Sequence, residues 1–161
     1  MKKLLLVVLL LAGSVAFGQQ PTPVGVWLPA HAKWQHAPAD VAPNLITTST
    51  RVLYFRPDGK VVVIDCIVNR ERGRYTTISA GDGQVVAAGE WHREQGRIMM
   101  RSQIVLRTVT KVGEKLPGPW SEDVLRFKGS LLLLHGVSYR REPELDKSAA
   151  EMVPKPGAPQ P

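Results

Sequence analysis

Short apolar runs, each ended by turn residues, recur along most of this chain. Residues 50–56 alternate between apolar and polar positions, with Leu53 and Phe55 on one face, and residues 61–68 form an apolar run after Pro57-Asp58-Gly59. Proline presets a turn's backbone angle and glycine accepts a positive φ, so the sequence predicts a β-hairpin here. Alternation with a period of two is typical of a strand with one buried face.

The same signals predict strands along the rest of the chain up to about residue 141. They fall at residues 24–28, 74–79, 84–92, 97–112, 122–127 and 131–139, and residues 80–83 form the expected turn of a second hairpin. Residues 29–49 are expected to be irregular because Pro38 and Pro43 interrupt them. About eight strands at this spacing predict an all-β fold, an antiparallel meander closed into an up-and-down barrel, with a β-sandwich as the alternative.

Residues 1–18 break this pattern. Lys2 and Lys3 precede an unbroken apolar run over residues 4–12, and Ala16-Phe17-Gly18 places small residues before Gln19. This order predicts a secretory signal peptide cleaved before Gln19 and a periplasmic or extracellular destination. The apolar run is too short for a bilayer core of about 30 Å, so no membrane span is expected.

The expected organisation therefore has three parts. They are a signal peptide at residues 1–18, a single β-barrel domain at 19–141, and a terminal segment at 142–161. Within the last part, residues 144–152 are expected to form a short helix, and the proline-rich residues after it are expected to be disordered.

Charge and cysteine content exclude several classes of protein. The net charge of +7 falls to +5 once Lys2 and Lys3 leave with the signal peptide. The remaining basic residues are scattered among acidic ones, whereas a nucleic-acid-binding face gathers them with aromatic side chains, so no nucleic-acid partner is expected. Cys66 is the single cysteine, so no intramolecular disulfide forms, and its apolar neighbours indicate a core residue.

The first predicted strand carries Gly25-Val26-Trp27 and is followed by the meander of hairpins. In these features the chain resembles the lipocalin-like barrels of the calycin group, although it lacks the family's mid-chain Thr-Asp-Tyr motif. The resemblance implies that Gly25 and Trp27 close one barrel end and that Arg140 or Arg141 packs across the indole as a cation–π pair. It also implies a small apolar ligand in the barrel mouth.

Strand alternation selects the side chains that are candidates to line such a cavity. Asp65 interrupts an apolar strand, either as a polar anchor for a ligand or as the partner of Arg101 or another arginine. Arg101 or Gln103 would orient a ligand carboxylate if it pointed inward and would be solvated if it pointed outward. Glu90 and His92 share one face of their strand, either in the cavity or on a solvated surface.

The sequence predicts no metal site, no cofactor and no catalytic residues. Glu90, His92 and His135 carry nitrogen and oxygen ligands, but no recognisable spacing ties them into a metal site. There is no Gly-x-Ser-x-Gly nucleophile elbow.

Three functional hypotheses remain. In the first, the protein is an exported, soluble binding protein that holds a small apolar or amphipathic ligand inside the barrel. In the second, the barrel is filled, and its outer surface or residues 29–49 dock another protein of the cell envelope. In the third, the protein is an enzyme that uses Glu90, His92 or Asp65 in the cavity. A cavity of several hundred Å³ favours the first, and a filled interior favours the second.

Overall fold

The computed structural model describes residues 21–153 except 39, 41 and 108–114. The predicted signal peptide at 1–18 and the proline-rich residues 154–161 lie outside this range, as does the end of the predicted strand at 97–112.

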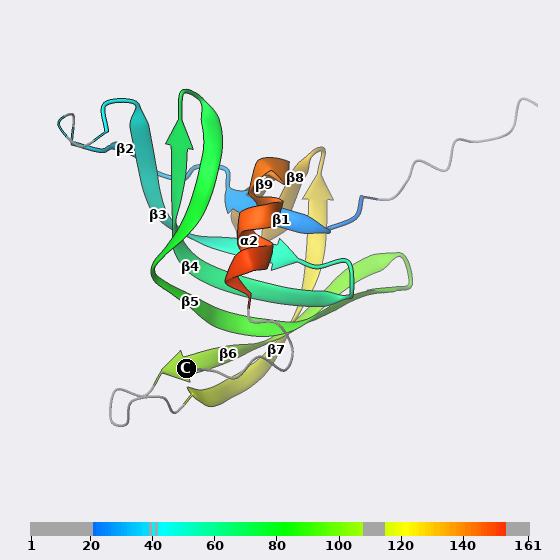
Figure 1. The fold of residues 1–161 in the computed structure, drawn as a ribbon. Coiled ribbons are helices and arrows are strands. Elements are labelled where there is room, and N and C mark those ends of the chain that lie inside the picture. Colours follow the sequence, from blue (N-terminus) through cyan, green and yellow to red (C-terminus); the bar gives the residue numbers. More distant parts are fainter. Residues whose placement is uncertain (1–20, 39, 41, 108–114, 154–161) are drawn as a thin grey trace, which may run out of the picture.

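The described residues form an antiparallel β-barrel (Figure 1). Its strands are β1 (Gly25–Pro29), β2 (Gln35–His36), β3 (Leu45–Phe55), β4 (Lys60–Glu71), β5 (Arg74–Glu94), β6 (Arg97–Arg107), β7 (Lys115–Lys128), β8 (Leu131–Leu134) and β9 (Val137–Arg141). Each strand from β3 to β9 pairs with the next one along the chain. The predicted all-β class and the closed up-and-down barrel are confirmed, and the sandwich alternative is excluded.

The first strand closes the barrel. Trp27 of β1 lies opposite Arg141 of β9, and Gly25 of β1 lies opposite Phe55 of β3. The two-residue β2 adds to the far part of β3 and stands outside the closed ring. Closure pairs β1 with both the first and the last strand of the meander, which covers edges that would otherwise promote aggregation.

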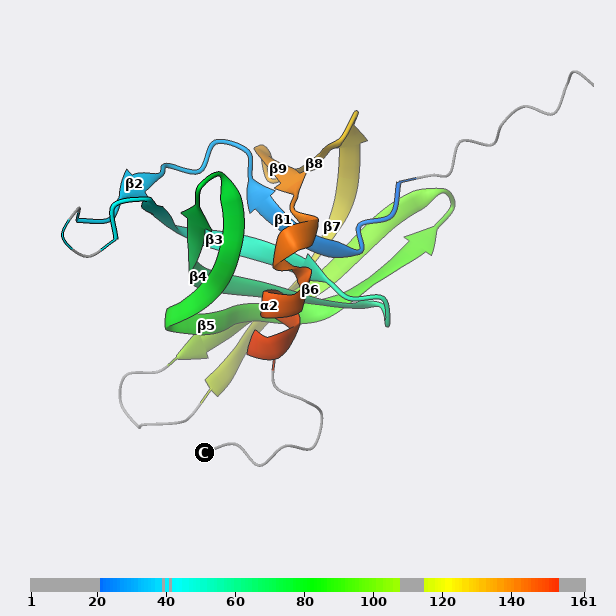
Figure 2. The ribbon, with the colours of Figure 1, turned by 45° about the horizontal axis from the view of Figure 1, so that its top comes forward.

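β5 differs from the sequence prediction, which placed a hairpin turn at residues 80–83. The structure has one strand there, and both of its halves pair with β4: Ser79 lies opposite Ile67, and Gln84 lies opposite Asp65. The extra residues between them form an irregularity in the ladder, and the strand bends sharply at this point (Figures 1 and 2). Glycine-rich segments serve bulges as well as turns, so composition alone does not separate the two.

The predicted strand at 131–139 is also divided differently. His135 and Gly136 have φ values of 49° and 77° and connect β8 to β9 as a two-residue turn. Positive φ at both central positions is the geometry that matches the twist of a tight hairpin. This turn places His135 at one end of the barrel.

Two apolar clusters share the central strands. Val61 and Val63 of β4 belong to a cluster inside the barrel, whereas Val62 and Ile64 belong to a cluster on its outer face. The outer cluster packs against the segment after β9, the single turn η1 (Pro143–Leu145) and the helix α2 (Asp146–Met152) (Figure 2). This explains why β4 is apolar on both faces: one side fills the barrel and the other lies under the terminal helix.

Candidate functional site

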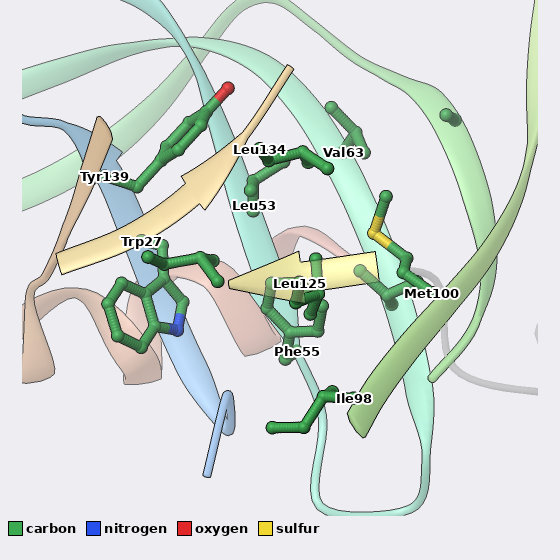
Figure 3. Close-up of a cluster of buried hydrophobic side chains, with 12 residues drawn as sticks. Trp27, Leu53, Phe55, Val63, Ile98, Met100, Leu125, Leu134 and Tyr139 are labelled. Carbon is green, nitrogen blue, oxygen red and sulfur yellow. The ribbon is translucent and has the colours of Figure 1, made fainter. Parts of the chain in front are cut away.

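One end of the barrel interior is filled by large side chains. The rings of Trp27 and Phe127 meet edge to face with centroids 5.8 Å apart, and the Trp27 Nε1 donates to the carbonyl oxygen of Pro23 at 2.5 Å. In Figure 3 Trp27, Phe55 and Ile98 lie toward this end of the inner cluster, and Val63, Leu134 and Tyr139 lie toward the other. Large side chains therefore fill the barrel interior around Trp27.

The opposite end holds a cavity of about 330 Å³. Its apolar walls come from alternate, inward-facing positions of several strands, and they include Leu53, Val63, Met100, Leu134 and Tyr139. Polar side chains stand among them, namely Arg51, Ser102, Ser121, Asp123 and His135. Ligand pockets combine an apolar lining with a few polar groups in this way.

Asp123 is the most unusual group in the cavity wall. Its Oδ1 lies 2.6 Å from the Nε2 of His135, which the β8–β9 turn holds in place. The side chain is only 16% exposed, and its Oδ2 is buried and has no hydrogen-bond partner among the described residues. A buried acceptor without a donor costs about 1–3 kcal/mol, so this oxygen is a natural contact for a donor group on a ligand.

Ser102 and Ser121 lie directly opposite each other on β6 and β7. Their Oγ atoms are 3.3 Å apart, and the Ser121 Oγ also lies 3.3 Å from the Ser102 carbonyl oxygen. Because Ser121 and Asp123 are two residues apart on one strand, their side chains face the same side. The hydroxyls and the carboxylate thus form one polar strip along the cavity wall.

Arg51 and Tyr139 border the same cavity. Two nitrogens of the Arg51 guanidinium donate to the two carboxylate oxygens of Asp65, at 2.8 and 3.1 Å, and this pairing raises the pKa of the arginine. Burial raises the pKa of the Tyr139 phenol, with Arg51 acting in the opposite direction. The phenol is therefore neutral near pH 7 and retains its proton as a donor.

The five sequence-selected residues are not among those that line this cavity, and each has another partner. Asp65 is held by Arg51, which does line the cavity. Arg101 stacks on the Trp120 ring, 4.7 Å from its centroid, and Gln103 donates to the Gly118 carbonyl oxygen. Glu90 pairs with Lys60 at 3.0 Å, which lowers the pKa of Glu90, and His92 lies 3.6 Å from Glu94.

Strand parity explains the position of four of these residues, whereas Asp65 shares the inward face of Val63 and contacts the cavity-lining Arg51. Met100 and Ser102 line the cavity, so the intervening Arg101 and the following Gln103 point to the outer face. Glu90 lies opposite Arg101 across the ladder and therefore shares its outward face, as does His92 two residues later. Sequence reasoning considered both orientations and lacked the one fact that separates them, the register with a buried neighbour.

The two arginines named for the barrel closure lie in different surroundings. Arg140 lies on the outer face, where it donates to Glu142 and to the Tyr75 hydroxyl, while Trp27 faces inward. Arg141 is the arginine near the start of β1: it donates to the carbonyl oxygen of Val24 and pairs with Asp146. Its guanidinium occupies the space that a side chain at Gly25 would need.

Sequence reasoning missed Asp123 and His135 as cavity residues. Alternation across Ser121, Asp123 and Leu125 was available as a signal, because Leu125 is a core position. The pairing with His135 depends on the His-Gly turn between β8 and β9, which the prediction did not place.

No group of three or more potential metal ligands comes together among the described residues. None of the helices in the described ranges has the length and apolar character needed to cross a bilayer. Comparison with protein-family models, curated proteins and solved structures found no significant match to this chain.

Proposed function

We propose that this protein is an exported, lipocalin-like binding protein that holds a small amphipathic molecule in the open end of its barrel. The observation that carries the proposal is the 330 Å³ cavity with an apolar wall and one buried, unpartnered carboxylate oxygen. The volume is near the lower limit of ligand pockets, about 300–1,000 Å³, and favours a compact ligand over a long lipid chain.

The apolar and the polar parts of the cavity wall together predict how the ligand is oriented. Its apolar part packs against Leu53, Val63 and Met100, and a hydroxyl or amine at its other end donates to Asp123. His135 holds the other oxygen of that carboxylate and so fixes its direction. The lipocalin-like kinship is supported by Gly25-Val26-Trp27 on the first strand and by the closed meander.

Binding of N-phenyl-1-naphthylamine, a neutral two-part aromatic probe with one N–H donor, tests the proposal. We expect its fluorescence to rise on binding the wild-type protein. Ala87→Leu extends a side chain into the cavity and should weaken binding at least about tenfold, because the probe loses apolar contact volume. Ala150→Leu, an exposed change on α2, is the matched control and should bind like wild type. Equal affinity of the Ala87→Leu variant and the wild type would place the probe elsewhere.

Native mass spectrometry of the protein purified from its own host separates this function from the docking alternative. A co-purifying small molecule that Ala87→Leu removes supports ligand binding. An empty chain that carries a tightly bound protein instead contradicts it and favours a docking module.

A further inference from the structure

Another cavity, of about 440 Å³, lies outside the proposed ligand site, at the turn between β5 and β6. Three arginines, Arg93, Arg97 and Arg126, line it, and none of the described residues in its wall is acidic. The N-terminal end of the described chain runs near the β5–β6 turn (Figures 1 and 2). Pro21 at this end borders the cavity. The cavity is therefore strongly cationic.

The strand register brings two of these charges together. Ile98 of β6 lies opposite Leu125 of β7. Arg97 comes directly before Ile98 in the sequence, and Arg126 comes directly after Leu125. In an antiparallel ladder the two arginines are then cross-strand neighbours, and like charges in that position destabilise a sheet. Glu94 of β5 lies opposite Arg97 on its other side and offsets part of this repulsion. Neither arginine forms an ion pair with any of the described residues.

The third arginine is fixed in place. The Arg93 Nη2 donates to the Pro21 carbonyl oxygen at 2.7 Å, and the residue lies opposite Ile98 across the ladder. The β5–β6 turn, with φ values of 48° and 75° at Gln95 and Gly96, is tight and holds the two strand ends at a set spacing. The turn thus sets the spacing of the two strand ends that carry Arg93 and Arg97.

The rest of the wall is apolar. Ile98, Leu125 and Phe127 belong to the inner cluster or pack against it, and each also contributes to this cavity. A guanidinium presents paired donors that match phosphate oxygens, and two adjacent guanidiniums match the double charge of a phosphate monoester. Val124, which lies two residues before Arg126 on the same face of β7 and is 40% exposed, lines this cavity beside them and suits an attached ring or short chain.

We propose that this cavity binds a phosphate group carried on a partly apolar molecule, with Arg97 and Arg126 holding the phosphate. The bound anion relieves the repulsion between the two arginines. The same chemistry is offered by a free organic phosphate and by a phospholipid headgroup.

Calorimetric titration of the full mature chain with phenyl phosphate tests the proposal. The double variant Arg97→Gln/Arg126→Gln should bind at least about tenfold more weakly, because two charge-assisted contacts are lost. Arg72→Gln/Arg74→Gln removes the same charge at the exposed β4–β5 turn and should bind like wild type. Equal weakening of both double variants, or of neither, overturns the site.

Thermal melting distinguishes a loss of phosphate binding from a folding defect of the variant. Phenyl phosphate should raise the melting temperature of the wild type and leave that of Arg97→Gln/Arg126→Gln unchanged, while without phosphate the variant should melt no earlier than wild type. An earlier melt of the variant without phosphate overturns the repulsion argument.

Vesicles of phosphatidylcholine with and without phosphatidylglycerol show whether the bound phosphate belongs to a lipid headgroup or to a free organic phosphate. Sedimentation with the anionic vesicles that depends on both arginines assigns a lipid headgroup. Binding of phenyl phosphate without such sedimentation assigns a free organic phosphate.

Discussion

Cys66 illustrates at the residue scale how burial controls chemistry. The thiol lies in the outer cluster, and burial raises its pKa to about 12, with the nearby Asp65 charge as a second cause. Reaction with electrophiles requires the thiolate, which is then almost absent near neutral pH. The sequence-based interpretation of Cys66 as a core residue agrees with this position.

The raised pKa makes the free energy of unfolding depend on alkaline pH. The unfolded thiol ionises near its ordinary value of 9.0 and the folded one near 12, so the contribution of the protonated thiol is complete below pH 9 and is lost as the pH rises toward 12. The difference in free energy of unfolding between the wild type and Cys66→Ala should be about 1.4 kcal/mol less favourable to the wild type at pH 10 than at pH 7. Urea denaturation of both proteins at the two pH values measures this. A difference that stays constant between pH 7 and 10 would contradict it.

At the element scale, Gly89 allows β5 to lie close to β6. A methyl group built at this position would lie 1.9 Å from the Arg101 carbonyl oxygen and 2.6 Å from the Ser102 Cα. Both are backbone atoms of the neighbouring strand, so a larger residue must displace the strand itself. A glycine inside a strand often marks such a close approach at a barrel bend.

Gly89→Ala should therefore lower the free energy of unfolding by about 2–3 kcal/mol. Gly129→Ala is the control: that residue has a φ of 59° and open space around it, so alanine costs only about 1 kcal/mol of backbone strain. Chemical denaturation of the two variants compares the effects. Equal losses would mean that the strands separate easily at Gly89.

Element boundaries show what the sequence could predict and what it could not. The hairpin around Pro57-Asp58-Gly59 follows from local turn chemistry, and the structure has β3 and β4 on either side of it. The bend at residues 80–83 could not be predicted from local turn chemistry. The same residues suit a turn or a bulge, and only pairing with β4 decides between them. The cavity residues depend on the same long-range register, so Asp123 and His135 could not be selected from their own neighbours.

At the scale of the whole molecule, the two apolar clusters are physically inseparable. Successive residues of β4 face opposite sides, so Val63 fills the barrel while Ile64 supports the terminal helix. α2 has only seven residues, too few for stability alone, and its position depends on burial of Leu145 and Ala149. Loss of either layer therefore weakens the other.

Unfolding of the whole molecule should accordingly occur in one cooperative step. Leu132 in the inner cluster and Leu145 in the outer one are both fully buried, so Leu132→Ala and Leu145→Ala should each lower the free energy of unfolding by about 2–4 kcal/mol. In urea, the transitions seen by far-ultraviolet and near-ultraviolet circular dichroism should coincide in both variants, as they do for a two-state domain. Glu151→Ala, an exposed change on α2, should have little effect. If Leu145→Ala instead produced an early second step, the terminal helix and its cluster would be a separate unit attached to an independently stable barrel.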